Sequence, residues 1–133
     1  MTIAVAQDDS AEGAAALLHA AREAQFQQTR LAVLHVLDEF SPGVGEQQLA
    51  HEVGQALAAG GYGGLEWTLH TAPEEDNRAT ALIELTEQVQ ADLLVVGSKR
   101  RTPIGKFLLG STVQRVVLDS PVPVLVVKAP APQ

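Results

Sequence analysis

The chain contains no cysteine, which excludes disulfide bonds, thiol chemistry and metal sites built on thiolates. Aromatic residues are also scarce, at 4% of the chain, and acidic residues outnumber basic ones by 16 to 9. Both features argue against a nucleic-acid partner, because such binding needs a basic face and rings on which bases stack. No apolar run approaches the roughly 20 residues that cross a bilayer, so we expect no membrane contact.

The 133 residues carry a formal net charge of −7, and 46% of them are hydrophobic, which is typical of a globular protein with a substantial core. The length predicts one domain, over residues 1–128, and the tail 129–133 (APAPQ) is expected to be disordered. The first segment, MTIAVAQDDS, lacks the basic start of a secretory signal, so we expect a cytoplasmic location.

Apolar segments alternate with segments whose apolar residues recur every three or four positions, which predicts strands alternating with helices. We expect strands at Ile3–Ala6, Leu31–Leu37, Leu65–Thr71, Ala91–Val96 and Val122–Lys128, and helices at Ala11–Ala24, Glu46–Ala59, Asn77–Gln90 and about 110–118. Such an order builds a parallel sheet with helices on both faces. The second strand is apolar almost throughout and is expected to be buried, whereas the alternating third strand and the proline in the fifth favour sheet edges.

Several expectations concern single residues. In the first helix we expect Leu17, Leu18 and Ala21 on one face. Asp9 has the spacing to Glu12 of a capping box, with the aspartate as N-cap. His35 lies inside an apolar strand and is expected to be a hydrogen-bonded core residue rather than a metal ligand.

A basic cluster stands out where the fourth strand leads into the last helix. The segment 97–111, GSKRRTPIGKFLLGS, holds Lys99, Arg100, Arg101 and Lys106, four of the nine basic residues. Because helix N-termini attract anions, this segment predicts an anion site. Asp8 ends the first strand, which is expected beside the fourth, so Asp8 and Gly97 should lie in one crevice at the carboxyl ends of the strands.

Motifs for catalysis or metal binding are missing. Gly105-Lys106 does not form a phosphate-binding P-loop, since Phe107 stands where a hydroxyl would hold magnesium. His51-Glu52 does not continue into a zinc site, because Gln55 occupies the second ligand position. We find no nucleophile with a matching base, and therefore expect no catalytic residues, no protein-bound metal and no enzymatic activity.

The chain resembles the universal stress protein family over nearly its whole length. The resemblance rests on the apolar first strand ending in Asp8, on Leu34-His35-Val36, on ADLLVVGS at 91–98, and above all on GKFLLGSTVQRVVLDSPVPVLVVK at 105–128. It implies a single α/β domain with a Rossmann-like, doubly wound sheet of five parallel strands in the order 3-2-1-4-5, of the adenine nucleotide alpha hydrolase-like type.

The resemblance also implies a site for an adenine nucleotide, ATP or AMP, with or without magnesium. The family's nucleotide motif is a glycine, two residues, a second glycine, nine residues, and then Gly-Ser or Gly-Thr. Gly97 and Gly110-Ser111 fit the two ends of this motif, but Arg100 replaces the second glycine. The implied binding residues are Ala6, Gln7, Asp8, Val36, Val96, Gly97, Lys99, Arg100, Gly110, Ser111 and Thr112. Asp8 and Val36 would contact the nucleoside, and the residues from 97 onward would contact ribose and phosphate.

Other interpretations stay open at this point. Asp8 would also serve simply to end a strand and cap a helix; Ser111 is expected to cap the last helix, whether or not it binds phosphate; and the run 99–101 would also suit a solvated surface. Arg100 either supplies charge in place of a backbone contact or marks a member that has lost its nucleotide.

The resemblance implies a homodimer through the strand Val122–Lys128, with pairing centred on Val124–Val127 because Pro123 lacks an N–H. The function expected is nucleotide binding in a stress-response or signalling role. One alternative is a nucleotide-free dimeric scaffold that binds partner proteins. The other is a slow ATPase or adenylyl-transfer enzyme.

Overall fold

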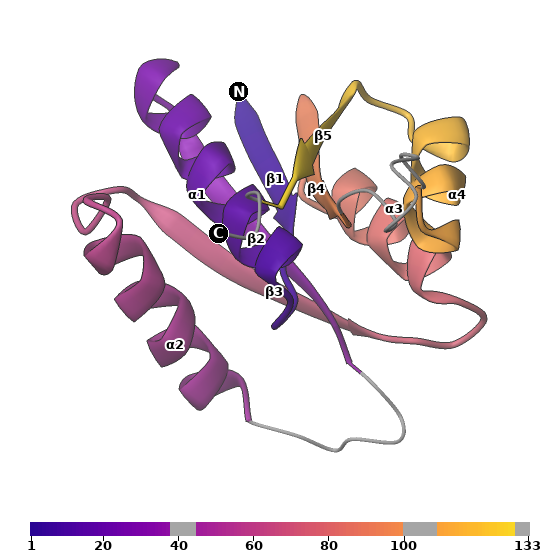
Figure 1. Ribbon diagram of the computed structural model, residues 1–133, viewed down its shortest axis with the longest axis horizontal. Coiled ribbons are helices and arrows are strands. Elements are labelled where there is room, and N and C mark those ends of the chain that lie inside the picture. The colour runs from indigo at the N-terminus through magenta and orange to yellow at the C-terminus, as the bar shows by residue number, and fades with distance from the viewer. Residues whose placement is uncertain (38–44, 100–108, 130–133) are drawn as a thin grey trace, which may run out of the picture.

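The computed structural model describes residues 1–37, 45–99 and 109–129. Five strands and four helices alternate along the chain (Figure 1). They are β1 (Thr2–Ala6), α1 (Ala11–Phe26), β2 (Arg30–Leu37), α2 (Glu46–Ala59), β3 (Trp67–Pro73), α3 (Arg78–Gln88), β4 (Leu93–Ser98), α4 (Ser111–Asp119) and β5 (Val124–Lys128). Among the described residues, no helix combines the length and apolarity needed to cross a membrane.

The strands form one parallel sheet in the order β3-β2-β1-β4-β5, which confirms the predicted fold. β1 is central, and its Val5 lies opposite Val33 of β2 and Val95 of β4. Strand order reverses between β1 and β4, because the chain passes first to one side of β1 and then to the other. Parallel sheets bind ligands beyond the carboxyl ends of the strands at such a point.

Each face of the sheet carries its own hydrophobic core. α1 and α2 cover one face, and α3 and α4 cover the other, with the sheet between them (Figure 1). β2 contributes to both cores through residues 31–34, all of them buried, as its continuous apolarity predicted. In α2, the expected face of Leu49, Val53 and Leu57 is buried.

The inward face of α1 differs from the expected one. Leu17 and Ala21 are buried, but Leu18 is 37% exposed, so its predicted place on the inward face is wrong. The buried side of α1 consists mainly of alanines, namely Ala16, Ala20, Ala21 and Ala24. These small side chains let the helix lie close to the sheet, and Leu18 falls outside this stripe.

The cap of α1 is also corrected by the structure. Ser10, not Asp9, is the N-cap, and its hydroxyl accepts a hydrogen bond from the Gly13 N–H at 3.0 Å. The predicted capping box of Asp9 and Glu12 is therefore wrong. Its spacing was one residue out of phase, because the chain is still extended at Ser10 and the helix begins only at Ala11.

Two strands, β3 and β4, begin and end later than expected, and a third, β5, begins later but ends where expected; the type and place of all three are confirmed. β3 covers Trp67–Pro73 and β4 covers Leu93–Ser98, and both β3 and β5 are edge strands as predicted. β5 begins at Val124 because Ser120 holds Val122 in a turn: its hydroxyl donates to the Val122 carbonyl at 2.8 Å and accepts from the Val122 N–H at 3.2 Å.

Candidate ligand-binding site

A pocket of about 330 Å³ lies at the carboxyl ends of β1 and β4, between the starts of α1, α3 and α4. Ten of the eleven predicted site residues line it: Ala6, Gln7, Asp8, Val36, Val96, Gly97, Lys99, Gly110, Ser111 and Thr112. The eleventh, Arg100, lies outside the described residues, as do Arg101 and Lys106. The structure thus brings together segments that are about one hundred residues apart in the chain.

The floor of the pocket is apolar. It consists of Val36 from β2, Leu82 from α3, Val96 from β4 and Val116 from α4, all of them buried and all part of one core cluster. Because these side chains come from four different elements, packing holds their positions. Such a floor suits a flat apolar group rather than a strongly hydrated one.

Asp8 forms a polar wall where β1 turns into α1. One carboxylate oxygen, Oδ1, accepts hydrogen bonds from the backbone N–H of Ser10 at 2.8 Å and from the Ser10 hydroxyl. The other oxygen has no hydrogen-bond partner among the described residues, and Asp8 lines the pocket. Asp8 therefore holds the helix start, and its second carboxylate oxygen stays without a hydrogen-bond partner in the described part of the chain.

Gly13 makes room for this carboxylate. A Cβ atom at Gly13 would lie 2.2 Å from Oδ1 of Asp8 and 2.8 Å from its backbone oxygen. Any larger residue would therefore push Asp8 out of place. The sequence shows Gly13 only as a poor helix former inside a helix, so this role could not be predicted.

Gly97 is required for a related reason. A Cβ atom at this position would lie 2.2 Å from the backbone oxygen of Glu12 and 3.0 Å from the backbone nitrogen of Gly13. The expectation that Gly97 is needed for backbone geometry is confirmed. The cause is the close approach of α1 to the end of β4, and not a left-handed backbone, since among described glycines only Gly61 has a positive φ.

The start of α4 forms a second wall of the pocket, which presents hydrogen-bond donors where Asp8 presents an acceptor. Its N-cap is Gly110, so the prediction that Ser111 caps this helix is wrong. Ser111 is already the first helical residue, and its hydroxyl makes no cap hydrogen bond. The side chains of Ser10 and Asn77 cap α1 and α3, whereas α4 has no side-chain cap, so its first N–H groups keep their capacity for an anion at the pocket.

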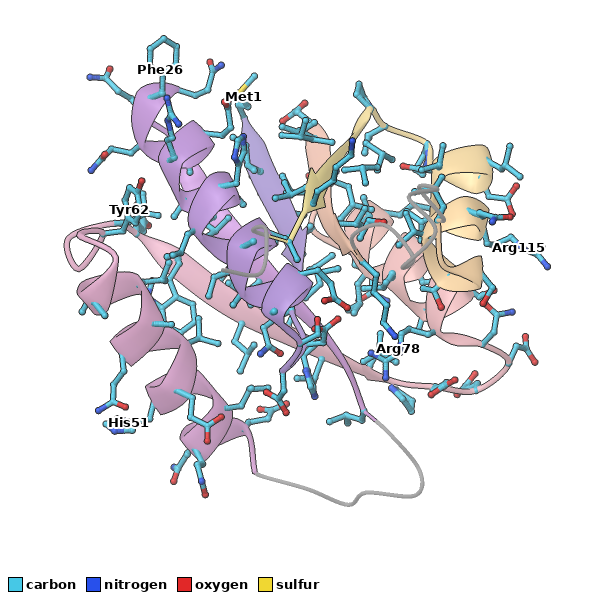
Figure 2. The ribbon with its side chains drawn as sticks, viewed as in Figure 1. Met1, Phe26, His51, Tyr62, Arg78 and Arg115 are labelled. Carbon is cyan, nitrogen blue, oxygen red and sulfur yellow. The ribbon has the colours of Figure 1, made fainter. Side chains whose placement is uncertain are left out.

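Four charged side chains of the described segments line the pocket: Asp8, Glu12, Lys99 and Arg78. Lys99 follows β4 and was predicted. Arg78 begins α3 and was not, because no local pattern links it to the other segments; Figure 2 shows it at the carboxyl end of the sheet. The described lining therefore carries two charges of each sign, contributed by different elements.

Gln7 is held by His35. Oε1 of Gln7 lies 2.7 Å from Nδ1 of His35, and the Gln7 N–H donates to the Leu34 carbonyl at 2.8 Å. The expectation that His35 is hydrogen-bonded is confirmed, although the residue is half-buried rather than fully buried. This pair fixes the rim of the pocket between β1 and β2.

The pocket can hold a ligand with three parts: a flat apolar group on the floor, a hydrogen-bond donor at Asp8 and an anion at α4. The described residues contain no group of three or more histidine, aspartate or glutamate side chains suited to hold a metal ion.

Comparison with known proteins connects this geometry to a family. The model of the universal stress protein family matches residues 1–128. A universal stress protein of Thermus aquaticus is 31% identical over 134 aligned positions, which cover 96% of this chain and 98% of that relative. A second relative, from Methanocaldococcus jannaschii, is 40% identical over 67 residues, which cover 49% of this chain and only 39% of that relative.

A solved structure agrees with these sequence matches. The chain is similar to a universal stress protein in complex with cAMP, with 26% identity, a TM-score of 0.74, and coverage of 98% of both chains. The family match therefore extends over all nine elements of the fold, including those that build the pocket. The chain belongs to the universal stress protein family.

Proposed function

We propose that this protein binds an adenine nucleotide, AMP or ATP, in the pocket between Asp8 and the start of α4. One observation carries the proposal: a single pocket joins an apolar floor, a free carboxylate oxygen and a helix N-terminus without a side-chain cap. The similar protein in complex with cAMP supports the choice of an adenine nucleotide.

In the proposed complex the base lies on the floor formed by Val36 and its neighbours. The free oxygen of Asp8 accepts a hydrogen bond from a hydroxyl or amino group of the nucleoside. The phosphate lies at the start of α4, where the N–H groups of Ser111 and Thr112 and the charge of Lys99 stabilise it. Magnesium, where it takes part, arrives bound to the phosphates rather than to a preformed protein site.

We further propose that the protein is a binding module and not an enzyme. The described pocket lining contains no histidine, and none of its hydroxyl groups (Ser98, Ser111, Thr112) is hydrogen-bonded to either of its carboxylates, Asp8 and Glu12, so no activated nucleophile is found there. Binding without turnover suits a stress-response or signalling role in the cytoplasm. Mass analysis of small molecules released from the purified protein would identify the nucleotide that it carries in the cell.

Calorimetry with AMP, cAMP and Mg-ATP tests the proposal. We expect saturable binding of AMP at one site per chain, weakened in the Asp8→Ala variant. A variant outside the pocket, Glu23→Ala, serves as the matched control. If millimolar nucleotide gives neither heat nor a thermal shift, the alternative of a nucleotide-free scaffold is favoured.

Arg100 carries the main argument for that alternative, because it stands in place of the motif glycine. The variant Arg100→Gly separates the two roles. AMP affinity should fall if the guanidinium binds phosphate, and it should rise if the arginine obstructs the loop. An unchanged AMP affinity would exclude both roles of Arg100, phosphate binding and obstruction of the loop.

We also propose that two copies of the chain pair through β5. This strand lies at the sheet edge, and Ala129 N–H donates to the Ser98 carbonyl of β4. Since neighbouring residues of a strand direct their backbone groups to opposite sides, Val124 and Val126 direct theirs away from β4. These groups are a template for a second strand.

A further inference from the structure

Arg78 is a pocket residue that neither the sequence pattern nor the nucleotide motif identifies. It is the first residue of α3, and its position is fixed by the cap before it, where Asn77 Oδ1 accepts from the Thr80 N–H at 2.8 Å. The residue is half-buried and lines the pocket (Figure 2). The start of α3 thus holds a large cation at a defined place on the pocket rim.

The guanidinium of Arg78 has no carboxylate partner within the described segments. The ion pair found there joins Arg115 and Asp119 on α4, with 3.6 Å between Nη1 and Oδ2. A guanidinium that is partly withdrawn from water is stabilised by an anion or by the face of an aromatic ring. A ligand in the pocket could therefore supply the anion or aromatic ring that stabilises the Arg78 guanidinium.

The position of α3 decides which part of the ligand lies near Arg78. α3 packs over β2 and β3, and Leu82, one turn after Arg78, belongs to the apolar floor together with Val36 of β2. α4, whose start forms the anion-binding wall, packs against α3 and also against β4, the strand that Lys99 follows. Because Arg78 lies one turn before Leu82 of the floor, we assign it to the base side of the pocket, and we assign Lys99, which follows β4, to the phosphate side.

We propose that Arg78 lays its planar guanidinium against the exposed face of the base, whose other face lies on the apolar floor. This inference rests on the proposed nucleotide site and identifies the aromatic base as the group that Arg78 recognises. Arginine suits this role because its charged group is planar and weakly hydrated, whereas a lysine ammonium offers no plane for stacking.

Binding of three ligands to the wild type and to Arg78→Met and Arg78→Lys tests this assignment. Adenosine carries the base without phosphate, ribose 5-phosphate carries phosphate without the base, and AMP carries both. In Arg78→Met we expect the affinities for adenosine and AMP to fall by about the same factor, roughly fivefold, as is typical of a partly desolvated cation–π contact. The affinity for ribose 5-phosphate should stay unchanged, and Arg78→Lys should recover only part of the loss.

Arg115→Met is the matched control, since Arg115 is exposed and points away from the molecule in Figure 2. Thermal melting of each variant verifies that the fold is retained. If Arg78→Met weakens AMP and ribose 5-phosphate but leaves adenosine unchanged, Arg78 binds phosphate and the assignment is wrong. If Arg78→Met binds all ligands like the wild type, the assignment also fails, while the proposed function stands. If the wild type binds no AMP, both fail.

Discussion

At the scale of single residues, the pocket depends on two positions where a side chain would not fit. Gly13 lets Asp8 approach α1, and Gly97 lets the end of β4 approach the backbone of α1 at Glu12. A Cβ atom at either position would prevent the close contact. Gly97 could be predicted because it belongs to a motif. Gly13 could not, because its partner Asp8 becomes a neighbour only through the turn held by Ser10. Arg78 was missed for a similar reason, since nothing near it in sequence marks it as a pocket residue.

Gly97→Ala should destabilise the protein by about 1–3 kcal/mol, the usual cost of overfilling a well-packed site. The new methyl group would meet the backbone of Glu12, which cannot move unless α1 moves with it. Urea denaturation measures the change. Gly64→Ala is the control, because a Cβ atom there meets nothing within 4 Å, and its effect should stay within about 0.5 kcal/mol. Equal unfolding midpoints for the two variants would contradict the close approach.

Ser10→Ala should have two separable effects. Loss of the N-cap of α1 costs about 1 kcal/mol of stability. Loss of the hydroxyl that binds Asp8 also removes one of the two hydrogen bonds that hold the carboxylate in position. Because the nucleoside is proposed to bind this carboxylate, adenosine and AMP should both bind more weakly. Ser120→Ala removes hydrogen bonds to Val122 at the far end of α4 and should lower stability without changing affinity. If both variants bind AMP like the wild type, Ser10 does not position Asp8.

At the scale of elements, helices and strands could be predicted more reliably than the residues that end them. The periodicity of α2 and the continuous apolarity of β2 are strong signals, and both elements are found where expected. The caps were displaced by one residue, to Ser10 and Gly110, because a cap is set by the last extended residue and several polar residues compete for that place. The shift at Gly110 has a functional consequence, since it leaves α4 without a side-chain cap.

Ser111→Pro tests whether the N–H groups of α4 bind phosphate. Proline is tolerated at the first helical position, and Gly110 before it has the extended backbone, with φ −62° and ψ 158°, that a following proline requires. The variant removes one N–H and one hydroxyl without breaking the helix. We expect AMP affinity to fall about tenfold, as for a hydrogen bond to a charged group, and adenosine affinity to stay unchanged.

Ser111→Ala, which removes only the hydroxyl, separates the two contributions and should give a smaller loss. Calorimetry with AMP and adenosine provides the measurement for both variants. An equal loss for adenosine would place the nucleoside, and not the phosphate, at the start of α4.

At the scale of the whole molecule, the sheet order and the position of the pocket could be predicted, because alternation and family resemblance restrict the topology. The shape of the pocket could not, since it depends on how closely α1, α3 and α4 approach the strand ends. The same topology leaves two sheet edges, β3 and β5, available for pairing.

Val126→Pro should weaken the proposed homodimer. The substitution removes an N–H that faces away from β4, so the sheet within one chain keeps its hydrogen bonds. Val126→Thr keeps this N–H and has a similar shape, which makes it the control. Light scattering at micromolar concentration should show a dimer for the wild type and for Val126→Thr, and more monomer for Val126→Pro. A monomeric wild type would rule out pairing through β5.

A crystal structure of the protein grown with AMP would locate each part of the bound nucleotide. We expect the base on Val36 and Leu82, a nucleoside hydroxyl or amino group at the free oxygen of Asp8, and the phosphate at the N–H groups of Ser111 and Thr112. AMP bound in the reverse direction, or bound anywhere outside this pocket, would contradict this expectation.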